Sequence, residues 1–285
     1  MKKALSLMTA AALVLSLAAC GSTASSAASS EAASSETASS DAASSEAASS
    51  EAASETETAE LSTVEPGKLI MSTNAAFPPY EMTTDSGEFE GIDIETAQAI
   101  ADKLGLELQI DDMDFDAALL SVQQGKADIV MAGVTVTDER KAVMDFSDSY
   151  ATGIQSIIVP EGSDIASPDD LAGKKIGTQR GTTGYIYCSD DFGDDNVVAY
   201  DDGLTAVQAL NNGQVDAVVI DNAPAQEFVA ANPGLKILDT SYAEEDYAIG
   251  MAKGSSLEDA VNAALKELKA DGTLQSIVDK YITAE

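Results

Sequence analysis

The 285-residue chain contains no histidine, no tryptophan and only two cysteines. Without histidine it lacks an imidazole for a Ser-His-Asp triad, for a metal site or for a pH switch near neutrality. Cys20 lies in the leader described below, so Cys188 is left without a partner for a disulfide. A lone cysteine with no histidine beside it is not expected to be catalytic. We therefore predict no catalytic residue, no metal and no cofactor.

Positive charge is also scarce. The chain has 15 Lys and Arg against 49 Asp and Glu, which gives a formal net charge of −34. A surface of this kind repels nucleic acid and anionic lipid headgroups, so neither is expected to bind the folded body. We interpret the charge as a contribution to solubility.

A long hydrophobic run is missing, because a comfortable membrane span needs about 20 apolar residues. Residues 1–20 instead join two lysines to a short apolar run, Leu5–Leu17, and end in Leu-Ala-Ala-Cys, which is typical of a signal peptide. The ending resembles the lipobox of bacterial lipoproteins, in which Cys20 would be acylated (palmitate) and would anchor the protein on the extracytoplasmic face of the cell membrane. An ordinary signal peptide with a chance cysteine is the alternative.

Residues 21–62 form an Ala/Ser/Glu tract with repeats of SSEAASSE. It has no aromatic and almost no large aliphatic residue, so it cannot bury enough apolar surface to offset the entropy of ordering. We predict a disordered tether. Transient helix is the alternative, since Ala and Glu favour helices, but the many serines oppose a stable one.

From Lys68 onwards, short apolar strands alternate with helical patterns, and this alternation predicts an α/β protein with parallel sheets. Glycines and capping residues set the ends of these segments. The predicted strands are 68–71, 89–92, 106–110, 128–131, 153–158, 175–178, 197–200, 216–220 and 247–251, and the predicted helices are 93–104, 114–122, 167–173, 204–210, 257–268 and 274–281.

The order of these segments recurs. Ser121–Gly133 (SVQQGKADIVMAG) aligns without a gap with Ala209–Asp221 (ALNNGQVDAVVID), so that Gly133 and Asp221 fall at equivalent strand ends. Chance likeness between two βα units is the alternative to a true duplication. We predict two lobes, 66–153 with 250–285 and 154–249, joined by crossings at 153–158 and 247–251.

The segment VMAGVTVTDER, residues 130–140, brings a strand end, two threonines and an arginine together. Ligands of open α/β sheets bind at the carboxyl ends of strands. Arg140 and the backbone amides of Thr135 and Thr183 would suit a carboxylate, while Asp221, the Gly133 carbonyl and the Thr135 hydroxyl would suit an ammonium group. The two pockets together describe an α-amino acid. Pairing of Arg140 and Asp221 with nearby surface charges is the alternative.

The chain resembles the amino-acid-binding branch of the solute-binding proteins that serve ABC importers. The resemblance covers residues 66–285 and is carried by the following motifs: Phe77-Pro78-Pro79-Tyr80-Glu81, Gly91-Ile92-Asp93-Ile94, Asp114-Phe115-Asp116, Gly125–Thr135, Thr137-Asp138-Glu139-Arg140, Asp145-Phe146-Ser147 and Gly181-Thr182-Thr183. It implies a two-lobe periplasmic-binding-protein-like fold with a ligand cleft between the lobes and two interlobe crossings. It also implies a monomer that binds a free amino acid without chemistry and delivers it to the transmembrane subunits of a permease.

For the site, the resemblance implies that Phe77 and Phe115 flank the ligand side chain, and that Arg140, Thr135, Thr183, Gly133 and Asp221 hold its two charged groups. Relatives that bind basic amino acids tend to carry an aspartate where this chain has Asn74. A neutral amide cannot neutralise a distal cation. Asn74 and Gln179 are therefore predicted to contact a neutral polar side chain.

Two other functions remain open from the sequence. A sensor or adhesin would use the same site. A lyase or hydrolase would need a second titratable group beside Asp221, and the sequence gives no signal for one.

Overall fold

The computed structural model describes residues 61–282, so the predicted signal peptide, Cys20 and nearly all of the predicted tether lie outside the described part. Two mixed sheets and one small hairpin sheet organise it. The first sheet has the order β5 (Glu107–Asp112), β1 (Lys68–Thr73), β6 (Ile129–Val130), β14 (Gly250–Ala252), β7 (Met144–Phe146). The second has the order β10 (Val197–Tyr200), β9 (Ile176–Gln179), β11 (Ala217–Asp221), β8 (Ala151–Pro160), β12 (Leu235–Ile237), with β13 (Ala243–Tyr247) also paired to β8.

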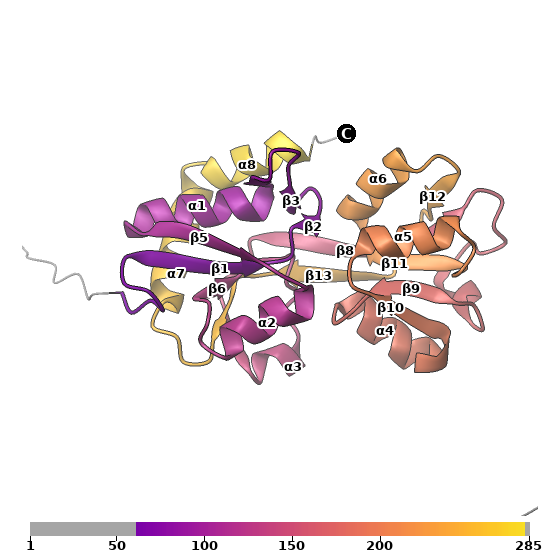
Figure 1. Ribbon diagram of the computed structural model, residues 1–285, viewed down its shortest axis with the longest axis horizontal. Helices are drawn as coiled ribbons and strands as arrows, with labels where there is room; N and C mark the ends of the chain where they lie inside the picture. Colours follow the sequence, from indigo (N-terminus) through magenta and orange to yellow (C-terminus); the bar gives the residue numbers. More distant parts are fainter. Residues whose placement is uncertain (1–60, 283–285) are drawn as a thin grey trace, which may run out of the picture. The chain divides into compact units, whose positions relative to one another are not determined.

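The first sheet lies between helices. Its strands β5, β1 and β6 are parallel, as predicted, whereas β14 joins β6 and β7 in antiparallel pairing. Figure 1 shows α1 (Ile92–Leu104) and α2 (Phe115–Gln123) on opposite faces of this sheet. The chain returns at its end, where α7 (Glu258–Ala270) and α8 (Thr273–Tyr281) pack against α1. The amphipathic periodicity of α1 is the reason for its place, because Ala97, Ile100 and Ala101 are fully buried.

The second sheet repeats the parallel core with β10, β9 and β11. In Figure 1, α5 (Gly203–Asn211) and α6 (Asn222–Ala231) lie on one face and α4 (Thr183–Phe192) on the other. The short helices η1 (Pro168–Leu171) and η2 (Asp194–Asn196) flank β9 and β10 in the chain. Ser167 caps η1 in a capping box with Asp170, which follows the predicted Ser-Pro helix start.

The aligned aspartates of the repeat have the same structural role in both lobes. The Asp128 carboxylate accepts the backbone amide of Ile70 in β1 at 2.7 Å, and Asp216 accepts the amide of Lys175, next to β9, at 2.8 Å. The aligned glycines, three residues earlier in each case, both have φ +66°. This left-handed conformation suits a residue without a Cβ atom. The sequence repeat thus reflects the same helix-to-strand turn built twice.

Two strands cross between the sheets. The chain leaves β7 for β8 and later leaves β13 for β14, and β13 pairs antiparallel with β8 from Ala243↔Gln155 to Tyr247↔Ala151. The predicted single strand 247–251 is wrong, because β13 ends at Tyr247 and β14 begins at Gly250. Each strand hydrogen-bonds in a different sheet, so the chain must break its ladder between them. We propose lobe boundaries at Gly153 and Gly250.

Several elements of the structure were not predicted from the sequence. The hairpin sheet of β2 (Ala76–Phe77), β3 (Glu81–Thr83) and β4 (Phe89–Glu90) was predicted only in its last strand, and α6 was not predicted. The folded body also begins earlier than residue 66, because Leu61 packs against the core and the Val64 amide donates to Asp128 at 2.7 Å. Among the helices of residues 61–282, none combines the length and the hydropathy that a membrane crossing requires.

Candidate functional site

A pocket lies where the strand ends of the two lobes meet. The structure places every ligand-binding residue predicted from the sequence in its lining. These nine residues are Asn74, Phe77, Phe115, Gly133, Thr135, Arg140, Gln179, Thr183 and Asp221. The lining also includes Glu81, Ala132 and Thr182, which were not predicted as site residues.

Arg140 occupies the corner that the sequence pointed to. Thr137 caps the short helix α3 (Asp138–Lys141) by accepting the Arg140 amide at 3.2 Å, and this turn directs the arginine into the pocket lining. The guanidinium donates from Nη1 to the Thr135 carbonyl at 2.7 Å and from Nη2 to the Gly181 carbonyl at 3.1 Å, so it touches both lobes. Its Cζ lies 5.4 Å from the centre of the Phe115 ring. Burial lowers the pKa of Arg140, but an arginine remains charged.

The Thr183 amide, which the sequence assigned to the carboxylate pocket, lies at a helix N-terminus. Thr183 is the first residue of α4, so its N–H belongs to the turn that has no intrahelical acceptor. Thr182 caps this helix by accepting the Tyr185 amide at 3.3 Å. A helix N-terminus and a buried guanidinium together attract an anion of carboxylate size.

Asp221 provides an acidic group in the same pocket that contains the positive charge of Arg140. It ends β11, is 7% exposed, accepts Gln155 Nε2 at Oδ2 (2.8 Å) and accepts the Tyr247 hydroxyl at Oδ1. Burial raises the pKa of Asp221 to about 7, the hydrogen bond from Tyr247 opposes this shift, and the nearby charge of Glu245 adds to it. A buried carboxylate in this situation gains from an ammonium partner. Within residues 61–282 neither Arg140 nor Asp221 forms a salt bridge, which disfavours the surface-pairing alternative.

Gly133 could not be another residue. Its φ is +55°, and a Cβ atom would lie 2.9 Å from the Phe77 ring. The Asp93 carboxylate fixes this turn by accepting the Gly133 amide at 3.0 Å and the Tyr150 hydroxyl at 2.7 Å. The Gly133 carbonyl is therefore held at the pocket wall by a buried partner behind it.

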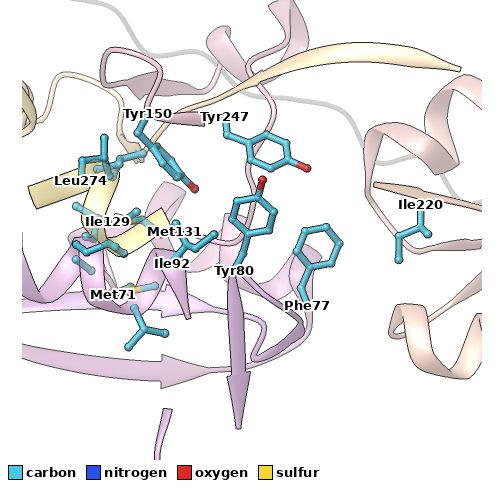
Figure 2. Packing of buried hydrophobic residues seen from close by; sticks show 14 of the residues in the cluster. Met71, Phe77, Tyr80, Ile92, Ile129, Met131, Tyr150, Ile220, Tyr247 and Leu274 are labelled. Carbon is cyan, nitrogen blue, oxygen red and sulfur yellow. The ribbon is translucent and has the colours of Figure 1, made fainter. Parts of the chain in front are cut away.

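The aromatic side of the site is a packed set rather than a single platform. Phe77 stacks on Tyr80 at 6.0 Å between ring centres, and Tyr80 meets Tyr247 edge-on at 5.3 Å. Figure 2 shows the Tyr80 hydroxyl directed towards the Tyr247 ring, with Phe77 beside it. Phe77 lines the pocket, whereas Tyr80 belongs to the core behind it.

Asn74 and Gln179, the two residues predicted to contact the ligand side chain, contact each other across the lobes. Gln179 Nε2 donates to Asn74 Oδ1 at 2.8 Å, and Asn74 Nδ2 donates to the Met113 carbonyl at 2.9 Å. Asn74 follows β1 of the first sheet and Gln179 ends β9 of the second. This amide pair is a direct interlobe contact.

Sequence reasoning missed four polar groups around the site: Glu81, Gln155, Glu245 and Tyr247. We found no signal in the sequence for a second titratable group beside Asp221, yet Tyr247 touches Asp221 and Gln155 bridges it to Glu245. Glu245 sits in the acidic run Glu244-Glu245-Asp246, which looks like ordinary surface in the sequence. Its alternation with Tyr247 along β13 was the only available signal.

No metal site accompanies this arrangement in the part of the chain that the structure describes: it contains no group of three or more Cys, Asp or Glu side chains placed to hold an ion. The geometry is that of a two-lobe α/β protein with one interlobe pocket, whose lining includes a buried arginine from the first lobe and a buried aspartate from the second.

Comparison with known proteins identifies the family. The sequence profile of the bacterial extracellular solute-binding proteins, family 3, matches residues 69–284, and the chain belongs to this family. Its members are extracytoplasmic proteins that bind solutes for transport and are not enzymes. Among curated relatives, the L-cystine-binding protein TcyJ of Escherichia coli (strain K12) is 33% identical over 78% of this chain and 85% of its own length. The arginine-binding extracellular protein ArtP of Bacillus subtilis (strain 168) is 34% identical over 76% of this chain and 87% of its own.

Solved structures agree with the fold. An ancestral arginine-binding protein bound to glutamine is 42% identical with a TM-score of 0.73 and covers 76% of this chain and 99% of that one. An ancestral arginine-binding protein bound to arginine is 43% identical with a TM-score of 0.72, covering 76% and 98%. The predicted two-lobe periplasmic-binding-protein-like fold is confirmed.

Proposed function

We propose that this protein binds a free α-amino acid in the interlobe pocket and delivers it to the transmembrane subunits of an ABC-type permease. The observation that carries the proposal is a single pocket lined by a buried arginine, two threonines and a buried aspartate. Arg140 and the amides of Thr135 and Thr183 would hold the carboxylate. Asp221 and the Gly133 carbonyl would hold the ammonium group. The amino-acid binders among the relatives support this assignment.

Delivery would depend on closure of the lobes around the ligand. Arg140 already contacts carbonyls on both lobes. Phe77 and Phe115, which belong to the first lobe, would enclose the ligand side chain. A ligand that binds the closed form better shifts the population towards it, and a permease can then recognise that form.

The anchor belongs to the same proposal. Lipidation of Cys20 would hold a monomeric body near its permease on the extracytoplasmic face, with residues 21–62 as the tether. Metabolic labelling with a palmitate analogue tests this point. A Cys20→Ala variant that stays fully membrane-bound and labelled would rule it out.

Two classes of amino acid are candidates for the ligand. The first is a neutral polar amino acid, because Asn74 and Gln179 both line the pocket and both are amides. Amide groups complement another amide or a hydroxyl, since each offers donors and acceptors. The ancestral relative bound to glutamine is compatible with this ligand.

The second candidate is a cationic amino acid, and Glu81 is the observation that favours it. Glu81 lines the pocket, is fully buried, and, among residues 61–282, its carboxyl oxygens meet no polar group other than the neighbouring carboxyl of Asp93. Burial, followed by the charge of Asp93, raises the pKa of Glu81 well above its usual range. A ligand guanidinium would supply the missing donors and allow the carboxylate to ionise. Asn74 and Gln179, in contrast, already satisfy each other.

Calorimetry on the purified body against the twenty amino acids and cystine tests both the function and the ligand. Binding of L-glutamine tighter than L-arginine, unaffected by Glu81→Gln, supports the neutral ligand. Binding of L-arginine that Glu81→Gln weakens by roughly tenfold or more supports the cationic one, since a hydrogen bond to a charged group contributes about 1.5–3 kcal/mol. Absence of any amino-acid binding would reject the function.

A further inference from the structure

Glu245 forms a hydrogen-bonded node that no assigned role explains. It lies on the crossing strand β13 and is 6% exposed. Its Oε2 atom accepts three donors: Thr135 Oγ1 at 3.1 Å from the first lobe, Thr183 Oγ1 at 3.0 Å from the second, and Gln155 Nε2 at 2.9 Å from the other crossing strand. One carboxylate oxygen thus accepts hydrogen bonds from the pocket residues Thr135 and Thr183.

The hydrogen bonds to Glu245 decide whether the Thr135 and Thr183 hydroxyls can donate or only accept in the pocket. A carboxylate can only accept hydrogen bonds, and a threonine hydroxyl has a single hydrogen to donate. Once Thr135 and Thr183 give that hydrogen to Glu245, their oxygens offer only lone pairs in other directions. The two oxygens lie 3.5 Å apart, and both residues line the pocket.

The same node orients the aspartate assigned to the ammonium group. Gln155 Nε2 donates to Glu245 and also to Asp221 Oδ2 at 2.8 Å. Both hydrogens of the amide nitrogen therefore point to carboxylates. Tyr247 donates to the other Asp221 oxygen, so every donor behind the site is turned away from the pocket. What remains on this wall is a set of acceptors.

We propose that Glu245 is a positioning residue that makes the amino-acid site selective for an ammonium group, by committing the Thr135 and Thr183 hydroxyls to act as acceptors in the pocket. This inference rests on the proposed function. The carboxylate corner is then left to Arg140 and to backbone amides, which are donors in every state. Glu245 lies on a crossing strand and binds threonines from both lobes, so the polarity is set only when the lobes are together.

The test compares each amino acid with its analogue lacking the amino group, by calorimetry on the folded body. The probes are L-arginine with δ-guanidinovaleric acid and L-glutamine with glutaramic acid. A Glu245→Gln variant has an amide that can donate to a threonine oxygen, which frees the threonine hydrogen to face the ligand. We expect Glu245→Gln to lower the affinity for the amino acid by roughly tenfold or more, while changing the affinity for the analogue by much less.

Controls separate this role from general support of the structure. Glu244→Gln changes the exposed neighbour on β13 and should leave both affinities unchanged. Thr183→Val removes one acceptor without touching Glu245 and should reduce the preference for the amino acid in the same direction. This second variant keeps the test decisive if Glu245→Gln does not fold.

The outcomes are distinct. Equal losses for amino acid and analogue in both variants would overturn the role of Glu245 and leave the proposed function intact. If the unaltered protein bound no amino acid in the full panel, the proposed function would fail first. A selective loss for the amino acid in either variant supports the inference.

Discussion

Arg140 is the one Lys or Arg among the buried side chains of residues 61–282. A guanidinium has five N–H donors, and two of its nitrogens bond the carbonyls of Thr135 and Gly181. Those bonds hold the plane of the group, and the remaining donors can meet a carboxylate side by side. A positive charge fixed in this way needs little reorganisation when an anion arrives.

Replacing this arginine gives the first prediction. Arg140→Ala should weaken amino-acid binding by about a hundredfold or more, because two charge-assisted hydrogen bonds are lost. The variant should still fold, since the side chain lines a pocket and not the core. Arg180→Ala is the matched control, because Arg180 is not part of the pocket lining, is 51% exposed and forms a salt bridge with Asp201. Calorimetry and thermal melting of the two variants measure these outcomes, and near-native affinity in Arg140→Ala would remove it from the site.

Asp221 predicts a pH dependence. Its pKa is raised by burial from 3.8 to about 7, so at lower pH the carboxyl is protonated and must lose its proton to hold an ammonium group. Affinity should therefore rise with pH, by at most about tenfold per unit, and level off above about pH 7. The free energy of unfolding of the ligand-free protein should depend on pH in the opposite direction. The raised pKa of Asp221 stabilises the fold at low pH, and that contribution is lost as the pH rises from 3.8 to about 7.

Two variants check the origin of the slope. Asp221→Asn cannot titrate and should bind weakly with a flatter profile. Asp201→Asn changes an exposed carboxylate and should keep the full slope. A slope of equal steepness in Asp221→Asn would assign the titration to other buried carboxyls, namely Asp93 or Glu81.

At the residue scale, the sequence predicted those groups whose neighbours in the chain already carry a pattern. Arg140 and Thr135 lie in one strand-to-helix segment, and Asp221 follows from the alignment of two strand ends. Glu245 and Gln155 join the site only through antiparallel pairing of β13 with β8, across a long interval of chain. Nothing local marks one acid in an acidic run as buried, so such residues need the three-dimensional pairing.

At the element scale, segments with one strong period were predicted well. The helix α1 differs from its predicted start by one residue, because its buried face follows the apolar pattern, and β10 matches its predicted bounds. The hairpin β2 to β4 was mostly missed because its strands have two or three residues, too few to show alternation. Helix α6 was missed because it begins directly at the end of β11 with no loop between them.

The crossing strands carry the next prediction. Gly153 lies in β8, and a Cβ atom there would lie 2.5 Å from the Tyr247 ring. Gly153→Ala should displace Tyr247 from Asp221, weakening ligand binding and lowering the free energy of unfolding by about 1–3 kcal/mol through overpacking. Ile154→Ala is the control on the same strand, because this side chain is 37% exposed. Urea unfolding and calorimetry measure the two effects, and an unchanged affinity in Gly153→Ala would show that Tyr247 does not position Asp221.

At the scale of the whole molecule, the described residues 61–282 contain two sheets whose strand ends share one pocket. The interlobe contacts include polar ones, namely Arg140 with Gly181, Gln179 with Asn74, and the Glu245 node, and the buried apolar core also continues from one lobe to the other. Polar contacts exchange readily with water, whereas the apolar cores of the lobes do not. Separation of the lobes would break the polar contacts and also expose apolar side chains where the core continues between the lobes.

A bound amino acid should then stabilise the molecule by linkage. At a free ligand concentration of 100 times Kd, the gain is about 2.7 kcal/mol, which for a chain of this length raises Tm by roughly 5–10 °C. Differential scanning calorimetry with rising ligand concentration measures it. Arg140→Ala at the same concentrations should show no rise, and a rise of equal size there would place the ligand elsewhere.

The antiparallel pairing of β13 with β8 has a kinematic consequence. A two-stranded ribbon can bend and twist, but it cannot slide without breaking every bond of its register. The lobes therefore turn about the ribbon instead of shifting along it. Groups bonded to the ribbon, such as Asp221 through Gln155 and Tyr247, lie near the axis and travel little, whereas the Asn74–Gln179 pair is not attached to it. Under the proposed function, a ligand would therefore meet Asp221, the proposed partner of its amino group, first, and Asn74 and Gln179 would contact its side chain only as the lobes complete their rotation.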